Sequence, residues 1–588
     1  MRITYNDKLN KLLNPYLESL LKEKSSLEPE TLTLFDLFME DLDIGGRYGI
    51  FSEILEPRLE EIIREENIES IANLMDGRLN TLFRYMLGDE FAGLFHTYLQ
   101  LEARCPHTIG YDRRAQRSAN PSNHLDHARD AWLQFLKLRA TGFSVEAILK
   151  GGNTPEDTEE FSGYMNSSYW LAAQIAQGNE KVIEYLNQVL TSENNVHRLQ
   201  RWYLHAIAIS GYRPLLELEG KLLLAAKLQE GLRQAIVETM DEGCPESYLY
   251  LFSIIYNNGL QRFASVKRSI AVCTGIGEQD SSERITNKYV ELIWNFLNHP
   301  ETARNALQSK DTVVLYLALW SIGFYDTDEI RAIVPDIIRK GAKHQIQTLL
   351  YFLRCTQSSQ MNHLISKDAF EVWHDDPKVV AAILPLYMDG LYLSRYSDNK
   401  EAPTLSDYFE SPEEAVRHYG YLKQVYQSIS AKEIYSPYVF PWDCVVLTRS
   451  DVVHKMAYIA WMTNDIRLRE ELCTYLPALE SYSRASYIGI VLAHTESKVE
   501  QEYVLQSLGD RSSDIRDEAY KVLSEMSLSP EQYQNIEELL RFKYSEMRIN
   551  AINLLMKQPE AQLAASIRRL LSNKNAERRL AGLDMMNR

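Results

Sequence analysis

An apolar pattern that recurs at a constant interval constrains the fold of this chain more than any other feature of its sequence. Val313, Ile346 and Val379 are evenly spaced, with a period of about 33 residues, and each opens an apolar stretch. Further apolar residues follow at positions +4 and +7: Leu317, Leu350 and Ile383, then Trp320, Leu353 and Leu386. Spacings of four and seven place side chains on one face of an α-helix. The pattern therefore predicts an amphipathic helix that recurs with this period.

A second group of repeats lies near the C-terminus. Three segments share an Arg followed three positions later by an Ala: Arg516 with Ala519, Arg548 with Ala551, and Arg578 with Ala581. An acidic residue precedes each Arg, an aliphatic patch follows each Ala, and another amphipathic helix precedes each segment. Two helices in each period indicate a helical hairpin repeat. We expect the acidic residue to lie near a helix start, and the Arg either to bridge to the neighbouring repeat or to be solvated.

A single helical hairpin cannot bury its own apolar face, whereas stacked hairpins bury a continuous core and leave a long concave surface. The sequence therefore predicts an all-α fold: an α-solenoid of stacked helical hairpins with a helical N-terminal region. Residues 391–450 lack the period and are rich in tyrosine, so we interpret them as a diverged or inserted segment. Residues 151–155 form the predicted boundary before the solenoid. The predicted parts of the chain are 1–150, 151–390, 391–450 and 451–588.

The C-terminal segments resemble the second helix of HEAT repeats, and their period of about 30–33 residues resembles the shorter bacterial kind. The chain is also similar to the N-terminal part of long, uncharacterised bacterial proteins in which HEAT-like repeats precede a further domain. The resemblance implies an interaction scaffold and carries over no catalytic residue. One departure is that Arg588 follows a second helix with no polar capping repeat. We therefore expect that the chain is truncated, continues in the natural protein or meets a partner there.

Composition and charge exclude several classes of protein. Hydrophobic residues make up 45% of the 588 positions, and only 26 Gly and 19 Pro occur, which excludes a disordered or low-complexity chain. The formal net charge of −18 argues against a protein that coats nucleic acid along its whole length. No secretory signal follows Met1, the longest nearly apolar run (315–325) is too short to span a bilayer, and the six cysteines stand apart. We expect a cytoplasmic protein with reduced thiols and no membrane association.

The sequence carries no motif of a known enzyme class: GxSxG, HExxH, GxxxxGK[ST] and paired CxxC motifs are all missing. One cluster could hold zinc, namely Cys105, His107, His124 and His127. Its spacing matches no closed zinc finger, so we interpret it as part of a polar surface loop. Asp376 precedes Pro377, and we expect it to cap a helix and not to take part in catalysis. We predict a non-enzymatic protein without a cofactor or a metal site.

Two basic stretches support an alternative function, a helical-repeat protein that binds nucleic acid. Residues 101–139 carry a net charge of +3, and residues 541–588 carry +6 against −24 on the remaining chain. The first stretch could equally pair with the acidic residues 28–69, whose net charge is −10. The negative charge of the remaining chain would oppose approach to a polyanion. The candidate basic patch comprises Arg113, Arg114, Arg117, Arg568, Arg569, Arg578 and Arg579.

The chain contains 35 tyrosines, several of them within residues 391–450. Tyr and Trp are enriched at protein interfaces because one end of the side chain is apolar and the other forms hydrogen bonds. The candidate partner surface comprises Tyr392, Tyr396, Tyr408, Tyr419, Tyr421 and Trp442. The alternative is that these tyrosines occupy half-buried positions in the helices. The expected function is a non-enzymatic scaffold that binds a protein partner, or a further domain of its own polypeptide, along the solenoid surface.

Overall fold

In the part of the chain that the computed structural model describes, the fold is all-α apart from one short β-hairpin. No helix of that part is both long and apolar enough to cross a membrane. The chain divides into two compact units: Met1–Pro335 with Phe352–Ser358, and Asp336–Tyr351 with Ser359–Arg588. The described residues are 7–44, 55–68, 71–104, 132, 135–136, 138–140, 167–191, 199–226, 229–240, 243–274, 285–325, 327–356, 359–389, 391–396, 401–429, 433–437, 444–541 and 545–588.

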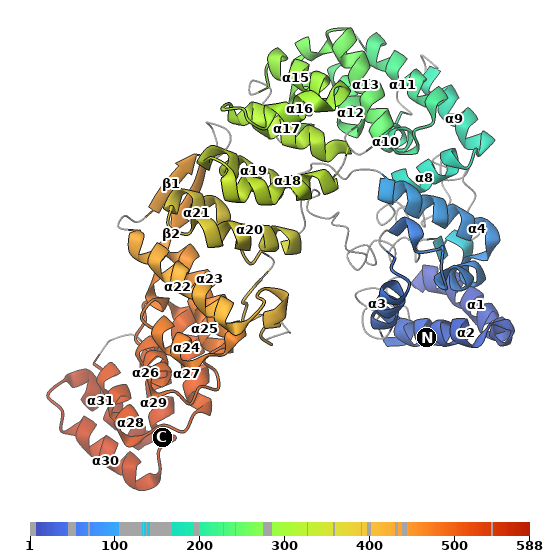
Figure 1. Cartoon of the computed structure of the whole chain (residues 1–588). Coiled ribbons are helices and arrows are strands. Elements are labelled where there is room, and N and C mark those ends of the chain that lie inside the picture. The colour runs from blue at the N-terminus through green and yellow to red at the C-terminus, as the bar shows by residue number, and fades with distance from the viewer. Residues whose placement is uncertain are drawn as a thin grey trace. The chain divides into compact units, whose positions relative to one another are not determined.

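The first unit consists of helices (Figure 1). They are α1 (Asp7–Glu23), α2 (Pro29–Ile44), α3 (Leu55–Glu65), α4 (Leu79–Arg104), α8 (Ser167–Ala176), α9 (Glu180–Thr191), α10 (Arg201–Ser210), α11 (Arg213–Ala225), α12 (Glu230–Met240), α13 (Pro245–Asn257), α14 (Ala264–Thr274), α15 (Asn287–Asn298), α16 (Pro300–Ala306) and α17 (Thr312–Tyr325). Two further helices, α18 (Thr327–Lys340) and α19 (Lys343–Thr356), contribute residues to both units.

The second unit continues with helices and the β-hairpin (Figure 1). Its elements are α20 (Ser359–Trp373), α21 (Pro377–Ile383), α22 (Pro412–Ser428), β1 (Glu433–Pro437), β2 (Cys444–Thr448), α23 (Arg449–Thr463), α24 (Ile466–Leu472), α25 (Ser481–Ile490), α26 (Lys498–Ser507), α27 (Ser513–Glu525), α28 (Pro530–Leu539), α29 (Ser545–Leu555), α30 (Glu560–Leu571) and α31 (Ala576–Asn587).

Alternate helices stack on one another within each unit. In the first unit, one row contains α8, α10, α12 and α14, and the other contains α9, α11, α13, α15 and α17. In the second unit, the rows are α24, α26, α28 and α30, and α25, α27, α29 and α31. Consecutive helices such as α26 and α27 pack as hairpins between the rows. This stacking confirms the predicted all-α fold of helical repeats.

The sequence periods coincide with the stacked helices. The residues that define the two periods are all buried: Val313, Ile346, Val379, Ala519, Ala551 and Ala581. The acidic residues of the C-terminal segments lie in the first turns of α27, α29 and α31, where they complement the partial positive charge of the helix start: Asp514, Glu546 and Glu577. The predicted boundary at 151–155 lies outside the described residues.

Arginines link successive repeats along the row from α25 to α31. Arg516 of α27 pairs with Glu546 of α29 over 3.5 Å, and Arg548 of α29 pairs with Glu577 of α31 over 3.2 Å. Of the two predicted roles, bridging to the neighbouring repeat is therefore confirmed for these two arginines. Arg578 of α31 pairs instead with a glutamate of α28.

A buried ion pair joins α24 to α26. Arg469 donates from Nε and Nη2 to the two carboxylate oxygens of Glu500, over 2.9 and 2.8 Å. Glu500 is fully buried, and the Thr495 hydroxyl also donates to it. A charge in such a place is tolerated only while its partner and its hydrogen bonds are present.

The β-hairpin departs from the prediction of a purely helical chain. β1 and β2 pair antiparallel, from Glu433 opposite Thr448 to Pro437 opposite Cys444. In β2, Val445 and Leu447 are buried whereas Val446 is exposed. This alternation with a period of two is typical of a strand that is buried on one face. The hairpin lies within residues 391–450, where the helical period is missing and therefore predicted no secondary structure.

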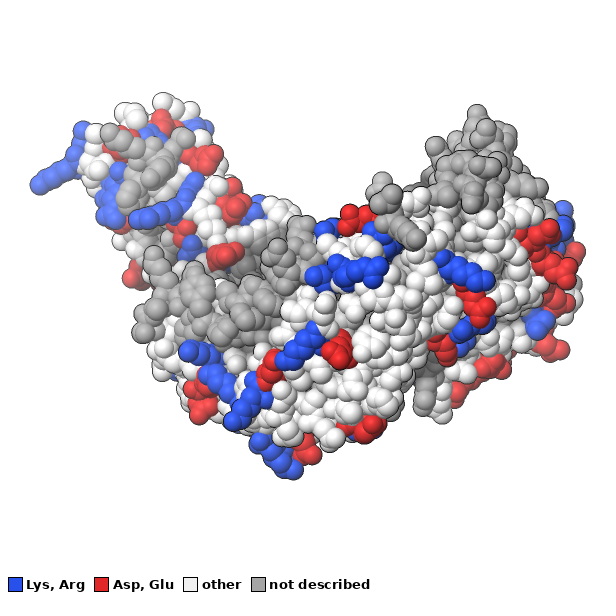
Figure 2. Space-filling view, turned by 90° about the horizontal axis from the view of Figure 1, so that it is seen from above, with Lys and Arg blue, Asp and Glu red and all other residues white. Residues whose placement is uncertain are grey.

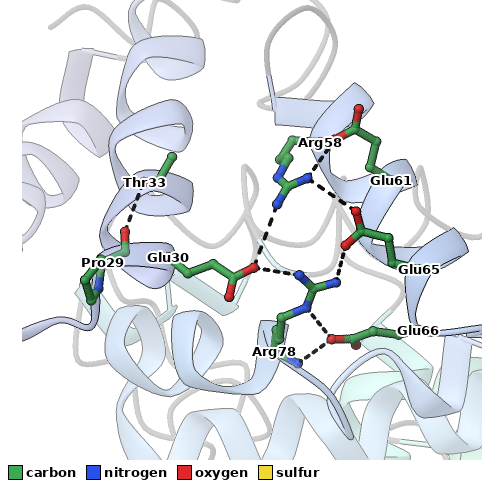
Figure 3. Close-up of polar contacts among 8 residues, drawn as sticks. All are labelled: Pro29, Glu30, Thr33, Arg58, Glu61, Glu65, Glu66 and Arg78. Atoms are coloured by element: carbon green, nitrogen blue, oxygen red, sulfur yellow. Dashed lines mark hydrogen bonds and ion pairs between the residues drawn. The ribbon is translucent and has the colours of Figure 1, made fainter.

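Two arginines neutralise part of the acidic stretch 28–69 (Figure 3). Arg78 donates to three carboxylates, each over 2.6 Å: Glu30 of α2, Glu65 of α3, and Glu66. Arg58 of α3 lies beside it and also contacts Glu30 and Glu65. The hydrogen bond from Arg78 lowers the pKa of Glu65. The network ties α2, α3 and the start of α4 together, whereas most of the basic stretch 101–139 lies outside the described residues.

We predict that Arg469→Met lowers the free energy of unfolding by about 3–5 kcal/mol, because it leaves the buried Glu500 carboxylate without its partner. Urea denaturation followed by far-UV circular dichroism measures the loss. Arg467→Met on the same helix is the matched control, since Arg467 is exposed and its ion pair with Asp465 lies at the surface. It should leave the stability nearly unchanged. Equal losses in the two variants would contradict the role given to the buried pair.

Glu219 of α11 is a buried carboxyl without a partner. The side chain is fully buried, and within the described part of the chain neither of its oxygens has a hydrogen-bond partner. Burial raises the pKa of this carboxyl well above its usual value. The folded chain therefore binds the proton more tightly than the unfolded chain, and stability falls as the pH rises above about 4.3, the ordinary pKa of Glu.

We predict that Glu219→Gln removes this pH dependence. Between about pH 5 and the raised pKa, the stability of the wild type should fall relative to the variant by up to about 1.4 kcal/mol per pH unit. Urea denaturation at a series of pH values measures the difference. Glu217→Gln on the same helix is the control, because the Glu217 carboxylate is exposed and pairs with Arg213. If Glu219→Gln and the wild type show parallel pH profiles, the carboxyl does not titrate as described.

Candidate interaction surface

Two tyrosines of the predicted partner surface point outward. Tyr392 and Tyr396 are 68% and 74% exposed, more than any other large hydrophobic side chain described in the structure. They lie in the segment 391–396, between α21 and α22. Tyr482 of α25 lies beside them, with its hydroxyl 3.3 Å from that of Tyr392 and its ring centre 6.2 Å from that of Tyr396. Tyr392, Tyr396 and Tyr482 together form what we call the tyrosine surface.

The segment 391–396 is held against α23 and α25. Leu393 is buried. Tyr458 of α23 donates a hydrogen bond to the carbonyl of Leu391 over 2.9 Å, and the amide of Arg395 donates to Ser486 of α25 over 3.3 Å. Because the residues between the two exposed tyrosines face inward, the backbone presents both rings to solvent in a defined position.

The hydroxyls of the tyrosine surface form a short chain. Ser394 lies 2.7 Å from the Tyr482 hydroxyl, and this hydrogen bond lowers the pKa of Tyr482. The contact with Tyr482 raises the pKa of Tyr392. Either hydroxyl can donate in the contact between Tyr392 and Tyr482. The exposed rings are therefore oriented through their polar ends.

Arg395 anchors the segment to the next repeat. Its largely buried side chain pairs with Asp514 over 2.6 Å and with Glu518 over 3.6 Å, both on α27. Its guanidinium carbon lies 4.9 Å from the ring centre of Tyr396 and 5.8 Å from that of Tyr482, within cation–π range. Arg395 is thus an internal support of the tyrosine surface and not a free cation.

The remaining aromatic residues of the predicted surface lie elsewhere. Tyr419 is buried, and its hydroxyl donates to the carbonyl of Leu468 over 3.3 Å. Tyr408 is half-buried against the ring of His363, and Tyr421 is half-buried and stacked on the histidine that directly follows α20. None of these three tyrosines belongs to the tyrosine surface: Tyr419 is a core residue of α22, and the other two are half-buried. Trp442 lies outside the described residues.

Two buried histidines support the turn that leads into the segment 391–396. His363 of α20 accepts a hydrogen bond from the amide of Met388 over 2.8 Å, and its other nitrogen lies 3.0 Å from the carbonyl of Tyr408. Burial lowers the pKa of His363 to about 4. The ring is therefore neutral at pH 7 and holds Met388 in a left-handed conformation with φ of 52°.

His418 of α22 is enclosed in the same way. Its Nδ1 lies 2.8 Å from the Tyr387 hydroxyl, and its Nε2 lies 3.0 Å from Glu371. Burial lowers the pKa of His418 to about 4. The ring is fully buried, and its neighbours lie on α20 and in the turn that follows α21, so this histidine helps to hold α20, that turn and α22 together.

The basic patch near the C-terminus is partly neutralised. Arg569 pairs with Glu537 over 2.7 Å, and Arg578 pairs with the adjacent Glu538. Arg579 donates to two backbone carbonyls over 2.9 and 2.8 Å. Arg568 is exposed. Figure 2 shows that, on the face in view, many Lys and Arg side chains lie next to Asp and Glu side chains, with uncharged residues between these groups.

Several predicted site residues lie outside the described residues: Arg113, Arg114, Arg117, Cys105, His107, His124 and His127. Among the described residues, no group of three or more His, Cys, Asp or Glu side chains could hold a metal ion. Asp376 caps α21, as predicted, by accepting from the amides of Lys378 over 3.0 Å and of Val379 over 3.4 Å. It also pairs with Lys343 of α19.

Comparison with known proteins identifies one family whose model matches residues 34–588. It is described as a family of unknown function (DUF5724). The match covers nearly the whole chain and includes the tyrosine surface and both rows of helices in the second unit. Neither the curated proteins nor the solved structures give a significant match.

We predict that Arg395→Met releases the segment 391–396 from α27. The amides of this segment should exchange at least about tenfold faster with solvent deuterium, while α25 and α27 keep their protection. Hydrogen exchange read by mass spectrometry measures both regions. Lys521→Met is the control, because the exposed Lys521 also donates to Glu518 but does not contact the segment. Unchanged exchange in Arg395→Met would refute the anchoring role.

Proposed function

The chain therefore belongs to the family of unknown function DUF5724, and we propose that it is a non-enzymatic interaction scaffold. It binds a protein partner, or a further domain of its own polypeptide, along the surface of its stacked repeats. The observation that carries this proposal is the tyrosine surface, in which Tyr392 and Tyr396 are exposed while the backbone that carries them is held in place.

The physical properties of the tyrosine surface match those of binding hot spots. Tyrosine supplies a large contact area and loses little side-chain entropy on binding, and aromatic residues with Arg are enriched at such positions. Here the contact between Tyr392 and Tyr482 and the cation–π contacts of Arg395 restrict the rings before any partner arrives. Preorganisation of this kind lowers the cost of ordering side chains during association.

We further propose that the repeats are HEAT-like and that the protein acts in the cytoplasm. Support for the first comes from two stacked helices per period and from the arginine bridges between repeats. Support for the second comes from Cys244, Cys273 and Cys473, which are buried free thiols, as expected in a reducing compartment.

Protein binding is favoured over nucleic-acid binding by the charges of the C-terminal repeats. Glu537 and Glu538 engage Arg569 and Arg578, so these arginines are not free to contact phosphates. His363 of α20 uses both ring nitrogens in hydrogen bonds within the fold, and His418 of α22 is fully buried with its Nδ1 beside the Tyr387 hydroxyl, which supports a structural role for both over acid–base catalysis.

Affinity capture of the tagged full-length protein tests the proposal. Wild type, a Tyr392→Ala/Tyr396→Ala variant and the control Tyr325→Ala are compared after nuclease treatment, with bound proteins quantified by mass spectrometry. Tyr325 is an exposed tyrosine of the first unit, so it matches the change in residue type. We expect a stoichiometric companion that the wild type and the control retain and that the double variant loses by at least about tenfold.

Two outcomes would contradict the proposal. If nuclease treatment removes the proteins that co-purify with the wild type, the nucleic-acid alternative is favoured. Equal retention of every companion by the wild type and the double variant would remove the tyrosine surface as the binding site. Melting curves that agree between the two proteins exclude unfolding as the cause of any loss.

A further inference from the structure

The last described helix, α31, has two unlike faces. Ala581, Gly582 and Met585 are buried on the side that packs against α29 and α30. Gly582 sits so close to α30 that a Cβ there would lie 3.1 Å from Leu570. The other side carries three exposed apolar residues spaced by three: Leu580, Leu583 and Met586, which are 48%, 49% and 60% exposed. Three such residues on adjacent turns form a continuous apolar stripe about 9 Å long.

Near the start of this stripe, at the turn between α30 and α31, three exposed side chains are basic. Arg579 lies within the exposed face, and Arg568 and Lys574 are exposed close to the turn between α30 and α31. Within the described part of the chain, no ion pair engages these three side chains. The acidic residues of α31 are already occupied, because Glu577 and Asp584 both pair with Arg548 of α29.

We propose that this face of α31 binds an acidic amphipathic helix of a partner protein. A helix surface with apolar ridges accommodates another helix, whose anchors at i, i+3 and i+7 lie along the stripe. Acidic residues of that helix lie beside Arg568, Lys574 and Arg579. Charge complementarity of this kind selects the partner and orients it.

Charge also disfavours a second copy of this chain as the occupant. A copy that docked the same face would bring its own Arg568, Lys574 and Arg579 to the interface, and like charges close together oppose association. The proposal extends the scaffold function to a second surface. It does not depend on the tyrosine surface, which lies on different elements of the same unit.

The test uses the full chain and a fluorescent synthetic peptide of about 18 residues, with leucines at i, i+3, i+7 and i+10 and glutamates on the other faces. Anisotropy titrations compare the wild type, Leu583→Asp and Val499→Asp, the last being a control at an exposed valine of α26. We expect the wild type and the control to bind alike, and Leu583→Asp to bind at least about tenfold more weakly. Circular dichroism confirms that the variants remain folded.

A second variant tests whether the basic side chains beside the stripe select an acidic peptide. In Arg568→Glu/Lys574→Glu, affinity for the glutamate peptide should fall and affinity for the same peptide with lysines should rise. Tyr392→Ala/Tyr396→Ala should bind the glutamate peptide like the wild type, which separates this surface from the tyrosine surface.

Three outcomes would overturn the proposal. The first is no binding of the glutamate peptide by the wild type at about 1 mM, beyond the range of specific recognition. The second is equal binding of the glutamate and lysine peptides, which would reveal a non-specific apolar contact. The third is a dimer in light scattering that Leu583→Asp abolishes, which would identify a second copy as the occupant.

Discussion

In the described repeats, neighbouring helical hairpins cover one another's apolar faces, and this constraint determines most of the structure. In the second unit, the helices of each row touch their neighbours one period away, from α24 to α30 and from α25 to α31. Small residues make the close approach possible: Ala519, Ala551 and Ala581 recur at one position, and each is buried. Because every hairpin depends on its neighbours, the stability of such an array is a sum of hairpin and interface contributions.

Ion pairs between successive repeats fix how the stacked helices are aligned with one another. Arg484 lies one period before Arg516, pairs with Asp510 and extends the series of bridges that continues through Arg548. Asp514, at the start of α27, forms its ion pair with Arg395 of the segment 391–396. An irregular segment is thereby attached to the repeats through the same kind of contact that joins the repeats to each other.

The sequence predicted the parts of this structure that depend on local periodicity. Helices recur where the spacing of apolar residues requires them, and Asp376 caps the helix that begins at Pro377. The tyrosine surface was predicted only in part, because exposure depends on contacts between distant residues. Tyr392 and Tyr419 have the same side chain. Tyr392 lies in a segment without helix or strand and is exposed, whereas Tyr419 lies on α22 and is buried in the core. No sequence pattern indicated that Tyr482 belongs to this surface, because Tyr482 and Tyr392 are 90 residues apart in the sequence and come together only in the fold.

The core of the second unit positions its surface. His363 can hold Met388 in a left-handed conformation because burial keeps its ring neutral and both its nitrogens face backbone groups. That turn leads into the segment whose far end Arg395 fixes on α27. The segment is therefore restrained at both ends, so its exposed rings are ordered before a partner binds. The stripe on α31 is restrained differently, because it is part of a regular helix. One partner that contacted both surfaces would gain from their high effective concentration, whereas separate partners would be held together by the repeats between them.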